Sequence, residues 1–422
     1  YPEVIVGRIP FYGNYADLVA FIEAAHGHGI AVILDVVYNH FGPEGNYAGC
    51  FAPYTKQADT PWGAAINFDG EHSAGIRDFY LANTRYWLEE IGFDGFRMDA
   101  VSLVFDTSPT SILREITNLA RTIGEREQRQ VLMIAEHLCN DVNVTAANGL
   151  AYHSQWNDDL NHALFAFLTG EQGRHYSSFG SFADIVHAMQ NSFVLDGTRE
   201  HKFYGRLFGT DGRQTHATEH VVHSQNHDQI GNRLHGDRLI ATYGRDKALL
   251  ACMAVMASPY VPMLFMGEEY GETAPFLFFE DFGDPALVQA VREGRQREFA
   301  HQGTAPREPH DRLSFEDSKL QWSLLDTEEG QTQLQFYRTL IELKRSGKLG
   351  PRDKQQVGIA GDPESLLIAV QTDESLTLMN FSAHTRQVPV SEEWGLILSS
   401  NQPGTGGLIP PFSAHIYLRI AD

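Results

Sequence analysis

The sequence AVILDVVYNH, residues 31–40, determines how the N-terminal part of this chain is expected to fold. Its first seven residues are apolar except for Asp35, and such a run is typical of a strand buried on both faces of a parallel sheet. Two polar residues, Asn39 and His40, follow the run closely. We therefore expect a buried strand at residues 31–37 with polar side chains at its carboxyl end.

Helical and extended segments alternate on both sides of this stretch. Upstream, apolar residues recur at helical spacing from Leu18 to Ala25, behind Asn14, which is a residue type that favours the helix N-cap. The other predicted elements are a helix at residues 75–90, a strand at 95–101, a helix at 112–124, strands at 131–135, 152–156, 221–224 and 260–266, and a helix at 332–345. Such alternation predicts a parallel sheet with helices outside it.

Beyond Gly350 the pattern changes to short extended runs separated by Gly, Pro and Asp turns. These runs cover residues 365–371, 375–380 and 414–419. We expect an antiparallel β-sandwich domain at residues 350–422, preceded by an α/β domain at residues 1–349.

The composition excludes several classes of protein. With 42% hydrophobic and 20% charged residues, the chain has enough apolar surface to form a core, so it is not a disordered protein. The net charge of −22 would repel phosphate backbones and anionic lipid, so neither nucleic acid nor a membrane is an expected partner. Three widely spaced cysteines fit neither a disulfide framework nor a thiolate metal site. We expect a cytoplasmic protein with no metal ion and no cofactor.

Polar residues also follow three further predicted strands. The four strand-end blocks are DVVYNH at residues 35–40, GFRMDA at 95–100, AEH at 135–137 and QNHDQ at 225–229. In parallel α/β folds the carboxyl ends of the strands form the face where ligands bind, so these side chains are expected to converge. A structural interpretation remains open for each one: an Asp can cap a turn, Asp35 can neutralise Arg97, and His40 and His227 can be structural. Several buried acids without a function would, however, each cost stability.

Three of the acids, Asp99, Glu136 and Asp228, match the requirements of glycoside hydrolysis. One ionised carboxylate attacks the anomeric carbon, a protonated one donates to the leaving oxygen, and a third can hold substrate hydroxyls. Arg97 lies two residues before Asp99 on the same face of its strand, so it can keep that carboxylate ionised. Aromatic residues near the same loops can stack on sugar rings, although core packing is the alternative for them.

At these four blocks the sequence resembles the α-amylase superfamily of glycoside hydrolases, and the blocks stand in the order of that superfamily. Longer stretches, such as DVVYNHFGPEGNY from Asp35 and QNHDQIGNR from Gln225, resemble its maltooligosyl trehalose trehalohydrolases. The resemblance covers essentially the whole chain and implies an α/β fold, a (β/α)8 TIM-type barrel followed by a C-terminal antiparallel β domain. If residues 31–37 form the third strand, the first two strands and the usual N-terminal β domain have no counterpart here. We therefore expect the chain to begin inside a longer gene product.

The resemblance also implies catalytic roles, with Asp99 as the nucleophile, Glu136 as the acid/base and Asp228 as the third acid. The expected substrate-binding residues are His40, Arg97, His227, Asn226, Tyr38 and Trp156. The implied reaction cleaves the α-1,4 bond that joins terminal trehalose to a maltooligosaccharide, so the expected partner is maltooligosyl trehalose. The alternatives are a glucan branching or debranching enzyme of the same superfamily and an inactive truncated fragment.

Overall fold

The computed structural model describes residues 13–300, 303–401 and 407–420. The described residues divide between two compact units, one ending at Trp156 and the other beginning at Asn157. The division between these units follows Trp156, whereas the predicted domain boundary lies near residue 350. The predicted boundary stays a prediction.

The first unit contains four parallel strands. Their order is β1 (Ile33–Val36), β4 (Gly95–Met98), β5 (Leu132–Ala135) and β6 (Ser154–Trp156). All four residues of β4 are buried, whereas β1 has half-buried Ile33 and Leu34 and an exposed Asp35. The prediction that residues 31–37 are buried on both faces is therefore wrong. Val36 is buried, but Ala31, Asp35 and Val37 are exposed, and β1 lies at the end of the described strand order, where β4 is its one neighbouring strand.

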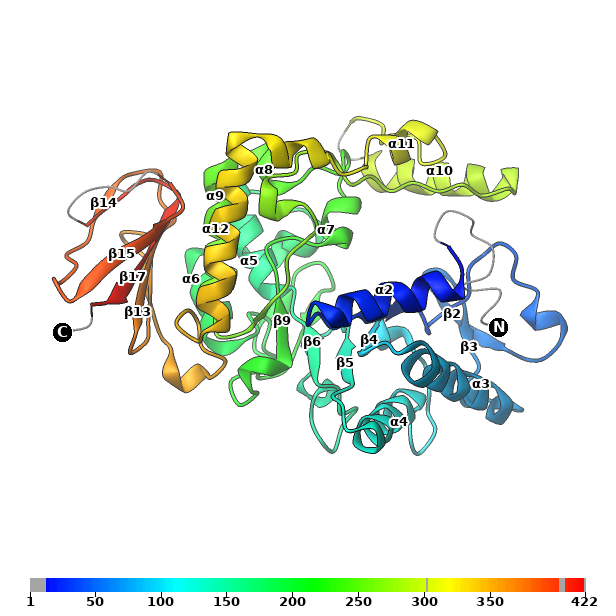
Figure 1. Ribbon diagram of the computed structural model, residues 1–422. Helices are drawn as coiled ribbons and strands as arrows, with labels where there is room; N and C mark the ends of the chain where they lie inside the picture. Colours follow the sequence, from blue (N-terminus) through cyan, green and yellow to red (C-terminus); the bar gives the residue numbers. More distant parts are fainter. Residues whose placement is uncertain (1–12, 301–302, 402–406, 421–422) are drawn as a thin grey trace. The chain divides into compact units, whose positions relative to one another are not determined.

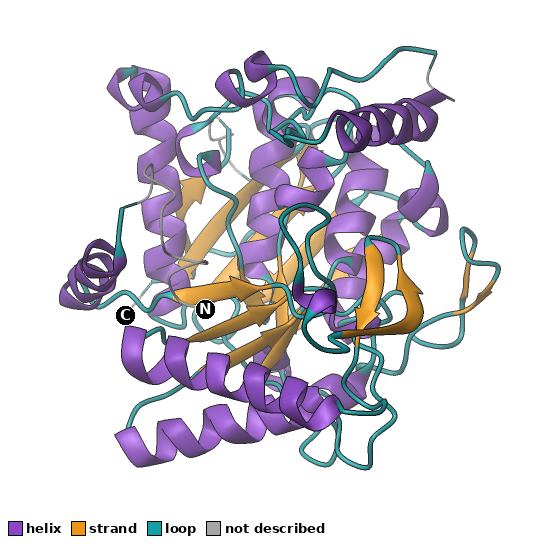
Figure 2. Cartoon of the chain, turned by 90° about the vertical axis from the view of Figure 1, so that its right-hand side faces the viewer, coloured by secondary structure: helices purple, strands orange, loops and turns teal. Residues whose placement is uncertain are grey.

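Helices lie along these strands, as Figures 1 and 2 show. They are α2 (Tyr15–Gly27), α3 (Ser73–Arg85), which continues as a π-helical turn at Tyr86–Ile91, and α4 (Ile112–Glu127). Asn14 caps α2 as predicted, because its side chain accepts from the Ala16 and Asp17 backbones. Helix α4 passes Gly124, where a helix end was predicted. A Cβ there would lie 2.8 Å from the Arg129 carbonyl oxygen, so this glycine permits close packing and does not end the helix.

Side chains from α2, α3, α4 and the strands form one hydrophobic core in the first unit. Phe96, Met98, Ile112 and Met133 are each almost completely buried within it. A hairpin of β2 (Thr55–Thr60) and β3 (Gly63–Ile66) lies between β1 and α3 in the chain. Val36 of β1, Phe96 and Met98 of β4 and Met133 of β5 belong to the hydrophobic core, which fixes the positions of these three strands.

The second unit begins with helices and two further parallel strands, β9 (His220–Val222) and β10 (Val261–Pro262). Its helices are α5 (Asp159–Thr169), α6 (Phe182–Asn191), α7 (His227–Gly231), α8 (Leu239–Tyr243), α9 (Arg245–Ala257), α10 (Pro285–Phe299), α11 (Arg312–Glu316) and α12 (Glu328–Arg345). A short hairpin pairs β7 (Glu200–His201) with β8 (Arg206–Leu207). The sequence did not predict α9, because every residue from Leu249 to Ala257 is buried and no polar face marks the helical period. In Figure 1, α9 and α12 lie side by side.

The C-terminal part of the second unit forms a five-stranded antiparallel sheet. Its strand order is β11 (Gly358–Asp362), β12 (Leu367–Gln371), β13 (Ser375–Asn380), β17 (Ser413–Arg419) and β15 (Trp394–Ser399). A small second sheet pairs β14 (Arg386–Gln387) with β16 (Leu408–Ile409). The predicted fold class is confirmed: a parallel α/β sheet is followed by an antiparallel β region. Of the helices in the described ranges, none combines the length and apolar character that a membrane crossing requires.

Candidate active site

Arg97, on β4, is the centre of an ion cluster in the first unit. Its Nη1 donates to Asp35 Oδ1 and to Asp99 Oδ1, each at 2.8 Å, and its Nη2 forms an ion pair with Glu136 Oε2 at 2.8 Å. The register of β1 and β4 places Asp35 opposite Arg97, which explains the first contact. The Arg97 side chain is 5% exposed, whereas that of Asp99 is 23% exposed. The structure thus brings Asp99 and Glu136 into contact with the same guanidinium group.

Hydrogen bonds hold the Asp99 carboxyl in its ionised form. Asn39 Nδ2 donates to Asp99 Oδ2 at 3.0 Å and to its backbone oxygen at 2.9 Å. Burial alone would raise the pKa of Asp99, but the hydrogen bonds from Asn39 and Arg97 and the Arg97 charge outweigh it, so the pKa lies below its ordinary value. Each Asp99 oxygen therefore has a donor that favours the carboxylate, as a nucleophile requires.

Glu136 is anchored to the backbone that follows Asp99. The Ala100 N–H donates to Glu136 Oε2 at 2.8 Å, and the Glu136 carbonyl accepts from Val101 N at 3.0 Å. Ala100 has a φ of +38°, a left-handed conformation that is uncommon for a residue with a side chain. Strained backbone of this kind persists only where its surroundings determine it, and it is concentrated at functional sites.

His40 and Trp156 extend the cluster. His40 Nδ1 is hydrogen-bonded to Asn39 Oδ1, and its ring stacks on the half-exposed Trp62 with centroids 5.2 Å apart. Burial lowers the pKa of His40, although the Asp99 charge acts in the opposite direction. The Arg97 guanidinium lies 4.2 Å from the centroid of the Trp156 ring, a cation–π contact. His40, Arg97 and Trp156, all predicted to bind substrate, therefore lie in one contact network with Asp99.

Tyr38 is placed differently from the other predicted sugar contacts. It is 8% exposed, packs edge-on against Tyr80 and Phe96, and donates from its hydroxyl to Asn83 Oδ1 at 2.6 Å. Burial raises the pKa of this hydroxyl, which stays protonated. The contacts of Tyr38 are those of core packing, the alternative given above for the aromatic residues.

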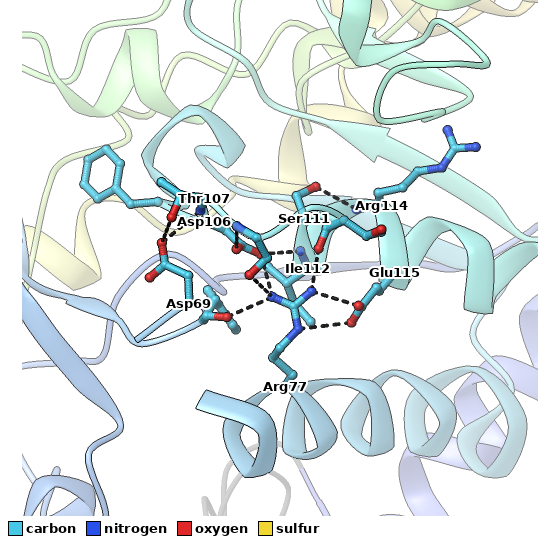
Figure 3. A network of polar contacts seen from close by, with 12 residues as sticks. Asp69, Arg77, Asp106, Thr107, Ser111, Ile112, Arg114 and Glu115 are labelled. Carbon is cyan, nitrogen blue, oxygen red and sulfur yellow. Dashed lines mark hydrogen bonds and ion pairs between the residues drawn. The ribbon is translucent and has the colours of Figure 1, made fainter. Parts of the chain in front are cut away.

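A polar network holds the loop that follows Asp99, as Figure 3 shows. Arg77, on α3, donates to Asp106 Oδ2 at 2.7 Å and to the Thr110 carbonyl at 2.8 Å, and it forms an ion pair with Glu115. Asp69 accepts from both the backbone and the hydroxyl of Thr107, each at 2.8 Å. The loop between Asp99 and α4 is thereby attached to α3 through Arg77 and to the segment before α3 through Asp69.

The remaining predicted residues, Asn226, His227 and Asp228, lie in the second unit at the start of α7. Asn226 caps the helix, since its Oδ1 accepts from Gln229 N at 3.0 Å, and its Nδ2 lies 3.1 Å from His223 Nε2. The Asp228 side chain is 51% exposed and lies 3.6 Å from His227 Nε2. Asn226 therefore orders the segment, while Asp228 and His227 stay accessible.

Sequence reasoning missed some contacts of the site. Asn39 was predicted only as a polar residue at the end of a strand, yet it donates directly to the Asp99 carboxyl. Its place beside His40 in the first strand-end block was the available signal. Among the described residues, no group of three or more His, Cys, Asp or Glu side chains could hold a metal ion.

Known proteins resemble this chain over most of its length. No family model matches the chain. A malto-oligosyltrehalose trehalohydrolase of Saccharolobus solfataricus is 39% identical over 394 residues, covering 92% of this chain and 66% of the relative. One from Mycobacterium tuberculosis is 32% identical over 405 residues, covering 94% of this chain and 69% of the relative. The chain belongs to the malto-oligosyltrehalose trehalohydrolase family.

Solved structures agree with this family. A candidate α-amylase from Salmonella typhimurium, with a structure at 1.4 Å resolution, is 34% identical and has a TM-score of 0.85, covering 97% of this chain and 71% of that protein. A pullulanase from Anoxybacillus, complexed with maltotetraose, is 16% identical with a TM-score of 0.65, which shows the fold alone; 96% of this chain and 56% of that one are covered. The predicted resemblance to the α-amylase superfamily, a group of glycosidases, is confirmed. The chain spans 58% to 69% of the length of the trehalohydrolases that it matches.

Proposed function

We propose that this protein is a retaining glycoside hydrolase that cleaves the α-1,4 bond next to the terminal trehalose of maltooligosyl trehalose. Its products are trehalose and a maltooligosaccharide. The observation that carries the proposal is the shared contact of Asp99 and Glu136 with the Arg97 guanidinium. The substrate rests on the family, since relatives covering most of this chain bear the name of that activity.

In the proposed mechanism Asp99 attacks the anomeric carbon as a carboxylate. Glu136 donates a proton to the glycosidic oxygen, so the C–O bond breaks and the leaving sugar departs with a hydroxyl group. The resulting glycosyl ester on Asp99 is then attacked by water, from which Glu136 removes a proton. Two inversions at the same carbon leave its configuration unchanged.

Arg97 and Asn39 would act before the reaction begins. They hold the two Asp99 oxygens at 2.8 and 3.0 Å, so the carboxylate need not reorganise when the sugar arrives. The Ala100 N–H fixes Glu136 in the same way through Oε2. Asp228 is proposed as the third acid, which binds sugar hydroxyls through its half-exposed carboxylate.

Maltotriosyl trehalose is the substrate that tests the proposal. The purified protein should release trehalose from it, with retained configuration at the new reducing end. Glu136→Gln should lower kcat by at least about a thousandfold, because the acid/base is lost. Glu125→Gln, an exposed change on α4, is the matched control and should behave as the wild type. Release of maltose or glucose instead of trehalose would refute the specificity.

A branching reaction is the second candidate. A 1,4-α-glucan branching enzyme of Nocardia farcinica is 27% identical over 295 residues, covering 62% of this chain and 35% of that enzyme. Incubation with linear amylose separates the two functions, because a branching enzyme creates new branch points and leaves the number of reducing ends unchanged. We expect no new branch points from this protein.

A further inference from the structure

Trp62 is an aromatic residue that the proposed mechanism does not use. It stands at the turn between β2 and β3, directly before Gly63, the first residue of β3. Thr60 Oγ1 donates to the Gly63 carbonyl at 2.9 Å and accepts from Trp62 N at 3.2 Å, so hydrogen bonds order this turn. At the other end of β3, Ile66 is 1% exposed and belongs to the hydrophobic core. An ordered turn on a hairpin anchored in the core thus carries the indole ring.

The indole ring of Trp62 is stacked on the imidazole ring of His40. The ring centroids are 5.2 Å apart, and the angle between the ring planes is 28°. His40 directs Nδ1 toward Asn39, to whose Oδ1 it is hydrogen-bonded. Turning the imidazole about its side-chain bonds would break the stack, so the stack favours the rotamer in which Nδ1 faces Asn39.

The orientation of the Asn39 amide follows from its contacts with Asp99. Nδ2 lies 2.9 Å from the Asp99 backbone oxygen and 3.0 Å from Asp99 Oδ2, and a carbonyl and an ionised carboxylate both accept hydrogen bonds without donating any. The amide nitrogen must therefore face Asp99, which directs Oδ1 toward His40. Asn39 is 1% exposed, so neighbouring protein groups, and not bulk water, satisfy its side chain.

These contacts determine which nitrogen of the His40 ring carries the proton. Asn39 Oδ1 is an acceptor, so its hydrogen bond with His40 Nδ1 requires a hydrogen on Nδ1. Burial lowers the pKa of His40, although the Asp99 charge acts in the opposite direction, so the ring is neutral at about pH 8. A neutral imidazole has a single N–H, and Nε2 of His40 is therefore an acceptor.

We propose that Trp62 is a positioning residue: by stacking on His40 it holds the imidazole in the Nδ1–H tautomer, and this keeps the Asn39 amide turned toward Asp99. Without the stack the His40 ring can turn away, and Asn39 Oδ1 then loses its donor. The amide is held from one side only, so its donation to the Asp99 carboxylate becomes less well ordered. The consequence for catalysis rests on the proposed function, in which Asp99 is the nucleophile.

Nuclear magnetic resonance tests the proposal in the free protein, without any substrate. The histidine rings are labelled with isotopic nitrogen, and the His40 signals are identified by their loss in His40→Gln. At about pH 8 the wild type should carry the proton on Nδ1, because the hydrogen bond of a neutral ring sets its tautomer. Trp62→Ala should lower the ratio of the Nδ1–H form to the Nε2–H form by about fivefold, the size of effect that one pair of stacked rings supports.

Three further variants complete the comparison. Trp62→Phe retains an aromatic ring and should keep the tautomer ratio within about twofold of the wild type. Phe51→Ala removes a different aromatic side chain of the first unit, 84% exposed, and should leave the ratio unchanged. Asn39→Ala removes the acceptor Oδ1 and should lower the ratio at least as much as Trp62→Ala does. Trp62 is 50% exposed, so replacing it by Ala leaves the hydrophobic core intact.

Two results would overturn the proposal. A wild-type His40 ring with its proton on Nε2 would refute the hydrogen bond from Nδ1 to Asn39. A tautomer ratio in Trp62→Ala equal to that of the wild type would show that the indole ring does not hold the imidazole.

Kinetics with maltotriosyl trehalose separate positioning by Trp62 from direct stacking on a sugar. If Trp62 orders the contacts of Asp99, Trp62→Ala should lower kcat by about fivefold, and Trp62→Phe should restore most of it. A higher KM at unchanged kcat would assign Trp62 to sugar binding and refute its effect on the nucleophile. Absence of trehalose release by the wild type would refute the proposed function, while the tautomer measurement would still decide the role of Trp62.

Discussion

Arg97 Nη1 lies 2.8 Å from Asp99 Oδ1, and the same guanidinium reaches Glu136 Oε2 through Nη2 at 2.8 Å. One planar group thereby sets the separation of the two carboxyls that the proposed reaction requires. A point charge in its place could pair with one of them but could not hold both in a fixed geometry. The forked shape of arginine is the property that matters here.

Arg97→Lys should therefore impair catalysis although the positive charge is kept. We expect kcat to fall by about 100-fold or more, because the two acids lose their common support. Steady-state kinetics with maltotriosyl trehalose measure this fall. Arg121→Lys, on the exposed face of α4, is the control and should leave kcat unchanged. An Arg97→Lys enzyme with wild-type kcat would contradict the positioning role.

Asn39→Ala should move the acid limb of the activity profile. Burial raises the pKa of Asp99, and the hydrogen bonds from Asn39 and Arg97 lower it further than burial raises it. Removing Asn39 removes one of these opposing contributions, so the Asp99 pKa should rise toward its ordinary value. The nucleophile then becomes protonated at a higher pH, and kcat/KM should begin to fall at a higher pH than in the wild type. An unchanged acid limb would show that the Asn39 contact does not control the ionisation of Asp99.

Arg77→Met should destabilise the protein. Arg77 pairs with Asp106, whose side chain is 2% exposed, so the substitution leaves a buried carboxylate without its cation. We expect a loss of about 3 kcal/mol in the free energy of unfolding, measured by denaturant titration. Arg121→Met removes an exposed pair and should cost less than about 0.5 kcal/mol. Equal losses of unfolding free energy in Arg77→Met and Arg121→Met would contradict the role of Arg77 in anchoring the loop drawn in Figure 3.

Asp69→Asn should reduce the sensitivity of the fold to acid. The Lys56 ammonium, 2.5 Å away, and the Thr107 contacts lower the pKa of Asp69 to about 2. A carboxyl group whose pKa is lower in the folded state contributes stability above its unfolded pKa of 3.8, and this contribution is lost as the pH falls toward about 2. As the pH falls over this range, the melting temperature of Asp69→Asn should therefore decrease less steeply than that of the wild type. The exposed Asp78→Asn on α3 serves as the control, and an effect as large as that of Asp69→Asn would refute the assignment.

Several elements were predictable because one chemical pattern dominated each of them. The helix behind Asn14 and the antiparallel C-terminal strands follow their local periodicity. Helix α9 was not predictable, since its residues are apolar all round and the period is invisible. Gly124 misled the prediction because close packing, like a helix end, favours glycine.

The residues of the candidate site were also predictable only in part. The strand-end blocks predicted Asp99, Glu136 and Arg97, because acids that follow apolar strands are costly unless they are paired or used. Tyr38 stands in another strand-end block, residues 35–40, yet its ring packs into the core beside Tyr80. Strand position predicts which residues approach the site, but the direction of each side chain depends on neighbours from distant segments.

The sequence by itself determined the family, the fold class and the identity of the candidate acids, because these depend on residue type and on order along the chain. Only the tertiary structure decided which side chains touch. The contacts of Arg97 with Asp35 and Glu136, and of His40 with Trp62, join residues 22 to 62 positions apart. Contacts of this kind arise when strands and helices pack, and local sequence carries no record of the distance between their side chains.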